Sequence, residues 1–369
     1  MTLYPNLILG ALEKVRYPGS GKNIVEAGMV DDNIRIEGCK VSFSLLFEKP
    51  NDPFMRSVVK AAETAILTYI SPDIEIKGNI VAVARQTFRS EAQAERLLPG
   101  VSHILAVASG KGGVGKSTVA TNLAVTLARK GYKVGLLDAD IFGPSQPKML
   151  GMEDARPVMK QVGARELIQP VENYGVKMLS IGFFVERKDA VLWRGAMASN
   201  ALKQLISDAN WGTLDFFLID LPPGTSDIHL TLVQTLALTG VVMVCTPQEV
   251  ALADVRKGIS MFTGEKVNVP VLGLIENMAW FTPAELPDNK YYIFGKEGGV
   301  RLAAELNIPL LGQIPIVQSI CEQGDRGVPV ALDANSPVSK AFDAIADQVV
   351  ERVVYRTEHL PPTKRVKVN

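Results

Sequence analysis

The stretch ASGKGGVGKSTVATNLA, residues 108–124, decides how the rest of the chain is interpreted. An apolar run at 103–108 leads into it, and a helical pattern with apolar residues on one face follows its glycines. Residues 110–117 fit the spacing GxxxxGK[ST], in which backbone N–H groups surround a polyphosphate and a helix N-terminus adds its dipole. The sequence therefore predicts a phosphate-binding loop between a buried strand and a helix that ends at Gly131.

This loop predicts bound ATP together with Mg²⁺. Lys116 is expected to reach the β- and γ-phosphates, Ser117 to ligate Mg²⁺, and Thr118 to contact the α-phosphate. A glycine-rich turn without a ligand is the alternative, and the strand and helix on either side argue against it. The other residues expected around the phosphates are those of the loop: Gly110, Lys111, Gly112, Gly113, Val114 and Gly115.

Acidic residues follow two further strand-like runs. LLDAD ends with Asp138 and Asp140, and LIDLPPG contains Asp220 and Gly224. Carboxylates at the carboxyl edge of a parallel sheet face the ligand crevice. We therefore expect Asp138 and Asp220 to join Ser117 at the Mg²⁺, and the N–H of Gly224 to reach the γ-phosphate. Taken singly, either acid could instead be a helix cap or a surface charge.

Apolar runs separated by helical patterns recur through the second part of the chain. Such runs indicate an α/β fold, here a P-loop NTPase whose mostly parallel sheet is covered by helices on both faces. The runs lie at 103–108, 133–137, 176–181, 215–220, 241–246, 271–275 and 310–314.

A different pattern precedes this part. One helix, two strands with a turn near Gly38, a helix opened by Asp52 and Pro53, and a last strand indicate a small α+β domain. The expected domains are residues 1–85, a linker with a short helix at 86–102, the ATPase domain at 103–357, and a disordered tail at 358–369.

Composition narrows the classes of function. Lysine plus arginine and aspartate plus glutamate both number 39, so we expect neither nucleic acid nor anionic membrane as a partner. The apolar runs are too short to span a bilayer. Cys39, Cys245 and Cys321 are dispersed along the sequence, which implies no disulfide framework and favours a reducing cytoplasm.

Several separated motifs resemble one family. The lysine-doubled loop, DADIFGPSQPKMLG, LIDLPPGTSD, TPQEVALADVRKG and GQIPIVQSI are similar to those of the deviant Walker-A ATPases, the MinD/ParA-like superfamily. The best match is its Mrp/ApbC-type branch of iron–sulfur cluster carriers, over about residues 101–350. NIVEAGMVDDNIRIEG in the first domain resembles the MIP18-like (DUF59) module that is often fused to these ATPases.

The resemblance implies a homodimer that binds ATP, hydrolyses it slowly, and transfers iron–sulfur clusters to apoproteins with the help of assembly factors. In that family the extra lysine, here Lys111, crosses the dimer to the partner's phosphates. Asp140 then positions the attacking water, with Lys111 and Lys116 completing the catalytic set. Asn277 would read adenine, although from the sequence alone it could equally be a turn residue.

The sequence departs from this family at both expected thiol sites. The stretch after Asn277 lacks the usual CxxC pair, and Asp52 stands where the first domain usually has a cysteine. Cys321 is the best remaining thiol ligand, so any cluster is expected to be labile. We expect Cys245 to be a core residue, Cys39 to be exposed, and His229 to cap a helix or lie at the surface rather than face the nucleotide.

Two alternatives to the carrier function stay open. One is an ATP-switched adaptor or metallochaperone that works without a cluster, which the missing thiols favour. The other is a MinD/ParA-like positioning ATPase, which would carry a basic terminal helix. The helix that begins at Ser336 and Pro337 has a mixed polar face, so we expect it to pack on its own domain.

Overall fold

The chain divides into two compact units, Met1–Arg96 and Leu97–Asn369, which are described separately. The predicted linker helix falls on residues outside the part of the chain that the structure describes. This computed structural model describes residues 3, 5–31, 34–47, 52–84, 97–163, 165–184, 195–283, 285–363 and 365.

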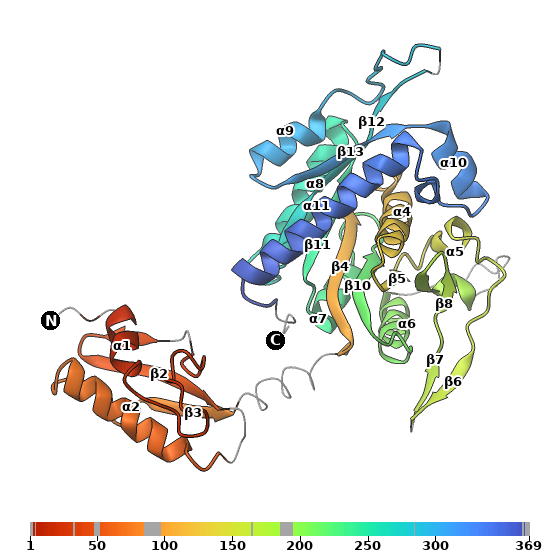
Figure 1. The fold of residues 1–369 in the computed structure, drawn as a ribbon. Helices are drawn as coiled ribbons and strands as arrows, with labels where there is room; N and C mark the ends of the chain where they lie inside the picture. Colours follow the sequence, from red (N-terminus) through yellow and green to blue (C-terminus); the bar gives the residue numbers. More distant parts are fainter. Residues whose placement is uncertain are drawn as a thin grey trace. The chain divides into compact units, whose positions relative to one another are not determined.

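In its described residues, the first unit is a three-stranded sheet with two helices (Figure 1). β2 lies between the other strands, antiparallel to β1 and parallel to β3. Alternate residues of β2 are buried and meet the apolar faces of α1 and α2, so the unit has a core of its own. Its elements are α1 (Pro5–Leu12), β1 (Arg35–Glu37), β2 (Lys40–Phe47), α2 (Met55–Tyr69) and β3 (Ile80–Ala84).

The turn between β1 and β2 contains Gly38, whose φ of +63° fits the predicted hairpin. The helix predicted to open at Asp52 and Pro53 begins later, at Met55. Asp52 is instead held in the preceding turn. Its carboxylate accepts the N–H of Phe54 at 2.8 Å and the hydroxyl of Tyr17 at 2.5 Å. The first helical turn is therefore displaced toward the C-terminus.

The second unit is built on an eight-stranded sheet with the order β13-β12-β11-β4-β10-β5-β9-β8. All neighbouring strands are parallel except β8, which runs antiparallel to β9 at the edge. The strands are β4 (Val101–Ser109), β5 (Val134–Asp138), β8 (Val171–Asn173), β9 (Val176–Ser180), β10 (Leu214–Asp220), β11 (Gly240–Cys245), β12 (Val271–Phe281) and β13 (Leu310–Ile316).

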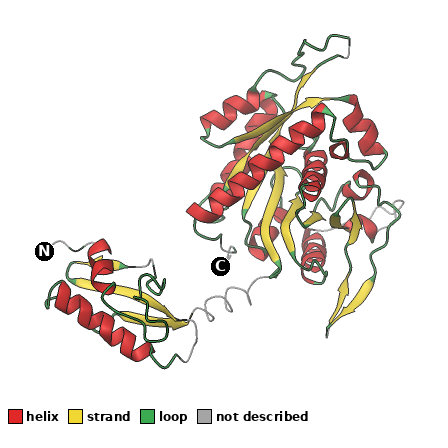
Figure 2. Cartoon of the chain, viewed as in Figure 1, coloured by secondary structure: helices red, strands yellow, loops and turns green. Residues whose placement is uncertain are grey.

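Helices cover both faces of this sheet (Figure 2). α4 and α11 contact each other and the strands on one face, while α8 and α9 pack together on the other. The central strands are consequently buried on both faces, which explains their continuous apolar runs. The helices are α4 (Lys116–Arg129), α5 (Gln146–Met149), α6 (Gly195–Ser207), α7 (Asp227–Thr235), α8 (Glu249–Thr263), α9 (Gly298–Glu305), α10 (Gln318–Asp325) and α11 (Pro337–His359).

This architecture confirms the predicted fold class, and local signals in two helices agree with it. α4 ends at Arg129, and Gly131 follows with a φ of +94°, as the glycine stop signal predicted. Ser336 caps α11 by accepting the N–H of Val338 at 3.3 Å. The apolar stripe of α11 is buried against its own unit, as expected.

Three features differ from the sequence prediction. β6 (Met159–Val162) and β7 (Arg165–Ile168) form an antiparallel ribbon that was not predicted, because its exposed strands lack a buried apolar face. β12 extends six residues beyond the predicted end at 275, reaching Phe281.

The third difference concerns the tail predicted to be disordered from residue 358. α11 continues to His359, and the guanidinium of Arg356 donates to Pro361 O at 2.8 Å and to Thr363 Oγ1 at 2.7 Å. These bonds hold the chain against the helix up to Thr363. Among the described residues, no helix is both long enough and apolar enough to cross a membrane.

Candidate functional site

The predicted phosphate loop joins the end of β4 to the start of α4, so its backbone N–H groups lie at a helix N-terminus. Gly113 and Gly115 have φ values of +81° and +80°, a region that favours glycine. A Cβ on Gly115 would lie 2.3 Å from Asn277 Nδ2, and one on Gly110 would lie 2.4 Å from the backbone of Asp254. Close packing and backbone conformation therefore both require the glycines.

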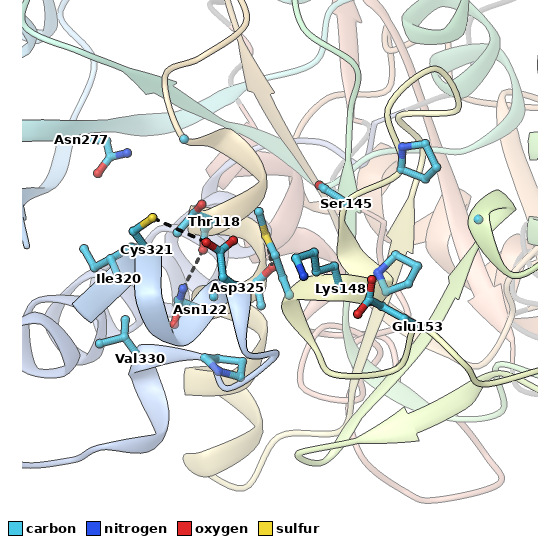
Figure 3. Close-up of a pocket in the computed structure, with 18 of the residues that line it drawn as sticks. Thr118, Asn122, Ser145, Lys148, Glu153, Asn277, Ile320, Cys321, Asp325 and Val330 are labelled. Carbon is cyan, nitrogen blue, oxygen red and sulfur yellow. Dashed lines mark hydrogen bonds between the residues drawn. The ribbon is translucent and has the colours of Figure 1, made fainter. Parts of the chain in front are cut away.

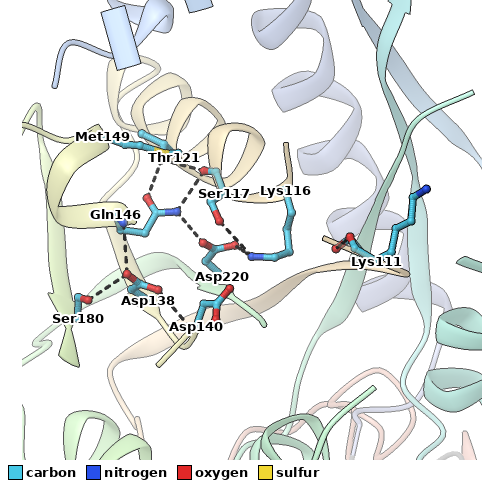
Figure 4. Close-up of polar contacts among 11 residues, drawn as sticks. Lys111, Lys116, Ser117, Thr121, Asp138, Asp140, Gln146, Met149, Ser180 and Asp220 are labelled. Atoms are coloured by element: carbon cyan, nitrogen blue, oxygen red, sulfur yellow. Dashed lines mark hydrogen bonds and ion pairs between the residues drawn. The ribbon is translucent and has the colours of Figure 1, made fainter. Parts of the chain in front are cut away.

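Lys116 is buried at the first turn of α4 and pairs with Asp220 (Figure 4). Its Nζ lies 2.5 Å from Asp220 Oδ1 and 3.2 Å from Ser117 Oγ. Asp220 is the last residue of β10 and is fully buried. The lysine predicted to bind phosphate is thus held by the acid predicted to lie at the Mg²⁺, and it must leave that acid to reach a phosphate.

Asp138 is a second fully buried carboxylate at the same sheet edge. It ends β5, pairs in register with Asp220, and accepts the hydroxyl of Ser180 at 2.9 Å and the N–H of Asp140 at 3.2 Å. Burial, with repulsion from Asp220, raises the pKa of Asp138 to about 8. Near pH 7 Asp138 therefore keeps its proton, while the carboxylate oxygens that it and Asp220 offer at one sheet edge are of the kind a divalent cation prefers.

Gln146, whose role was not predicted from the sequence, connects these groups. It is fully buried at the first position of α5, and its Nε2 donates to Asp220 Oδ2 at 2.8 Å and to Ser117 O at 3.1 Å. Its Oε1 accepts the hydroxyl of Thr121 at 2.6 Å, and its backbone N–H donates to Asp138 at 3.3 Å. The available signal was Pro147, which marks a helix start directly after the acidic loop.

Asp140 and Gly224 occupy less enclosed positions. Asp140 is half-buried, and burial raises its pKa while the charge of Lys116 opposes that shift. The N–H of Gly224, expected to reach the γ-phosphate, donates instead to Ser109 O at 3.1 Å. That N–H must be released before it can bind a phosphate.

Lys111 lies apart from the cluster around Lys116. Figure 4 shows its side chain directed away from Asp220 and Ser117. The loop is held under it by Ser109, whose hydroxyl donates to Lys111 O at 3.0 Å. The side chain of Lys111 is therefore separate from the hydrogen-bond network around Lys116.

A cavity of about 980 Å³ adjoins the phosphate loop (Figure 3). Thr118 and Asn122 of α4 form one wall, and Asn277 and Cys321 lie on another side. Asn277 is buried, and its Nδ2 donates to Val114 O at 2.8 Å. Asn277 is therefore a strand residue in contact with the loop, and not the turn residue that the sequence left open.

The three cysteines are free and separate. Cys245 is buried in β11, and burial raises the pKa of its thiol, so the expectation of a core residue is confirmed. Cys39 is exposed in the hairpin turn, also as expected. Cys321 is exposed on α10. The described residues contain no group of three or more His, Cys, Asp or Glu side chains that could hold a metal ion.

His229 caps α7, as the sequence favoured, but it is buried rather than at the surface. Its Nδ1 accepts the N–H of Ser226 at 3.1 Å. Burial lowers the pKa of His229 to about 4. The imidazole is consequently neutral near pH 7.

Family models match both units. Residues 100–350 match the model described as NUBPL iron-transfer P-loop NTPase, and residues 6–83 match that of an iron–sulfur cluster assembly protein. A protein of Synechocystis sp. named iron–sulfur cluster carrier protein is 42% identical over 354 residues, which cover 95% of this chain and 98% of that protein.

Further similarities cover a smaller share of the chain. A protein of the same name from Aquifex aeolicus is 51% identical over 263 residues, covering 70% of each chain. The solved nucleotide-binding protein from Archaeoglobus fulgidus, in complex with ADP, is 38% identical. It aligns with a TM-score of 0.56 and covers 64% of this chain and 91% of its own.

Proposed function

The chain belongs to the family of NUBPL iron-transfer P-loop NTPases, and we propose that it is a dimeric ATPase that carries iron–sulfur clusters to apoproteins. The observation that carries the proposal is the meeting of Lys116, Asp138 and Asp220 beside a glycine loop at a helix N-terminus. This arrangement supplies donors and one cation for phosphate, and two acids for a divalent ion.

The residues of the loop bind and orient the nucleotide. Backbone N–H groups around Gly113 and Gly115 face the phosphates, and Lys116 transfers from Asp220 to the β- and γ-phosphate oxygens. Ser117, Asp138 and Asp220 would hold Mg²⁺, which supplies charge neutralisation for the phosphates when bound. Because burial raises the pKa of Asp138, a bound Mg²⁺ would have to displace the proton of that carboxyl.

Hydrolysis requires groups on both sides of a dimer. Asp140, half-buried and two residues beyond Asp138, orients the attacking water. Lys111 points away from its own site and acts on the phosphates of the partner subunit, as an arginine finger does in trans. ATP then joins the two subunits, and its slow hydrolysis separates them. The partners are a second copy of the chain, assembly factors and apoprotein clients.

The cluster is the cargo, and its ligands come from more than one chain. Thiolates are the natural ligands of such clusters, and Cys321 is the exposed cysteine of the second unit. Two copies of Cys321, one from each subunit, would leave coordination to be completed by a small thiol, carboxylates or solvent. Because oxygen ligands are poorer than thiolates for iron–sulfur centres, we expect weak retention. We also propose a reducing cytoplasm as its location, which the three free cysteines support.

Anaerobic reconstitution with iron and sulfide tests the cargo. Wild type, Cys321→Ser and a variant lacking all three cysteines are compared by visible absorption and iron content. The proposal expects a labile chromophore in wild type that falls in Cys321→Ser, with Cys39→Ser as the matched control that retains it. If the cysteine-free protein holds as much cluster as wild type, the protein thiols are not the ligands.

One observation favours a second function. No three-ligand metal group is found among the described residues, and the sequence has no CxxC pair. A chain of this kind could keep the ATP switch and act as an adaptor or metallochaperone that never holds a cluster. Wild type that hydrolyses ATP but takes up no cluster under reconstitution would support the adaptor and end the carrier proposal.

A further inference from the structure

Glu276 is a buried carboxylate that the phosphate chemistry does not use. It lies on β12 with an exposed fraction of 0%, and no ion pair to it is found in the described ranges. A carboxylate without a cation is costly in a protein interior unless N–H donors surround it. Its position therefore needs a structural reason.

Two donors from separate elements satisfy this carboxylate. Oε1 accepts the backbone N–H of Gly299 at 2.7 Å, and Oε2 accepts from the side-chain amide of Gln313. Glu276 pairs in register with Cys245 of β11 and with Gln313 of β13. These three side chains therefore share one face of the sheet, beneath the first turn of α9.

The start of α9 is built to approach this carboxylate. A Cβ on Gly298 would lie 2.1 Å from Pro247 O, and one on Gly299 would lie 3.0 Å from Glu276 Cβ. Glu297, which precedes the helix at a φ of 55°, gives it no side-chain cap. Glu276 thus supplies from a distant strand the acceptor for an N-terminal N–H that no side chain caps locally.

The next residue along β12 belongs to the nucleotide cavity. Successive side chains of a strand point to opposite faces, so Asn277 lies on the side away from α9. There its amide bonds Val114 O at 2.8 Å and lines the cavity. One strand segment is therefore held from two sides, by α9 through Glu276 and by the phosphate loop through Asn277.

We infer that Glu276 is a positioning residue for the nucleobase end of the site. By fixing β12 against α9, its carboxylate sets the place of Asn277 relative to the phosphate loop. This rests on the proposed function, together with the expectation from the family resemblance that Asn277 contacts the base of ATP. Because a triphosphate without a base does not need Asn277, the inference separates the binding of ATP from the binding of phosphates alone.

Binding of Mg-ATP and of inorganic tripolyphosphate with Mg²⁺ is measured by calorimetry on the full chain. Glu276→Ala should weaken ATP binding by about 3- to 10-fold, the range of one net hydrogen bond, and leave tripolyphosphate binding within about twofold. Glu305→Ala is the matched control, because Glu305 is an exposed acid at the far end of α9. It should change neither affinity.

The double variant of Glu276 and Asn277 gives a sharper test, because it measures whether the two changes affect the same contact. Asn277→Ala should lose ATP affinity selectively, and the double variant should be no weaker than Asn277→Ala alone, since both changes act on one contact. Glu276→Gln keeps the side-chain shape and should show a smaller loss in the same direction. Glu276→Gln replaces Glu276→Ala in these measurements if the alanine variant does not fold.

Three results would decide against these assignments. Equal weakening of ATP and tripolyphosphate in the Glu276 variants would mean general damage to the fold and would overturn the inference. Additive losses in the double variant would do the same. If Asn277→Ala leaves the ratio of the two affinities unchanged, the proposed base contact falls first, and the role of Glu276 falls with it.

Discussion

Two regions at the carboxyl edge of the eight-stranded sheet hold their buried polar side chains in different ways. Beside the phosphate loop, Lys116, Asp138 and Asp220 bring opposite charges into a buried space. In the middle of β12, level with the end of β11, Glu276 is equally buried and accepts hydrogen bonds from two N–H donors. In the proposed function, the cluster around Lys116 acts on the charge of the phosphates. Glu276 instead fixes the position of β12 through its hydrogen bonds. Substitutions beside the phosphate loop should therefore have the larger effects.

The largest effect is expected at Lys111, whose charge we propose to act on the phosphates of another subunit. Lys111→Ala should lower ATP hydrolysis about 10³-fold, as loss of a finger residue does, with little change in ATP affinity of the monomer. Phosphate release and sedimentation with Mg-ATP measure the two properties. Mixing this variant with Asp140→Ala subunits should restore part of the activity, through one intact composite site. A wild-type rate in Lys111→Ala would contradict the action in trans.

Lys116→Ala comes next, because in the proposed function it removes a charge-assisted phosphate bond worth about 1.5–3 kcal/mol. The expected loss in ATP affinity is about 10- to 100-fold. The low end is favoured, since wild-type Lys116 must first leave Asp220. Calorimetry checks this, with Lys130→Ala at the other end of α4 as the control. Unchanged ATP affinity in Lys116→Ala would contradict the phosphate contact and, with it, the proposed difference between the Lys116 cluster and Glu276.

Gln146→Leu tests whether hydrogen bonds also matter in the cluster around Lys116. The change leaves Asp220 Oδ2 without the amide that Gln146 donates, and orphaning a buried acceptor costs about 1–3 kcal/mol. Denaturant unfolding of the second unit measures the loss. Gln318→Leu, an exposed glutamine that also begins a helix, should be close to neutral. Equal stabilities of the two variants would show that the network around Gln146 is dispensable.

The smallest effect concerns His229, a neutral group at the same sheet edge. Its pKa is about 4 when folded and near 6.5 when unfolded, so the unfolded chain alone binds the proton between these values. The contribution of neutral His229 to the free energy of unfolding is complete above pH 6.5. It declines by about 1.4 kcal/mol per pH unit as the pH falls toward 4.

His229→Asn keeps an acceptor for the N–H of Ser226 but cannot titrate in this range. Unfolding free energies at pH 7.5 and 5.5 should therefore fall less in the variant than in wild type. The same fall in both proteins would show that another group controls stability over this window.

The sequence was sufficient to predict those site residues that a local pattern marks, such as a glycine loop or an acid at the end of an apolar strand. The glycines, Lys116 and Ser117 lie within eight residues, and Asp138 and Asp220 each end an apolar strand, so both the fold class and this cluster could be predicted. Gln146 and Glu276 could not, because their partners Asp220, Gly299 and Gln313 become neighbours only after folding. The β6–β7 ribbon was missed for a related reason, since exposed polar strands leave no period in the sequence.

The position of Cys321 has a practical consequence for spectroscopy. Its thiol is exposed in the wall of the cavity that also contains Asn277, whereas the thiol of Cys245 is buried and resists modification. A Cys39→Ser protein would therefore accept a thiol-reactive fluorophore at one place. The emission of that dye would report filling of the cavity in real time, without a radioactive nucleotide or a coupled assay.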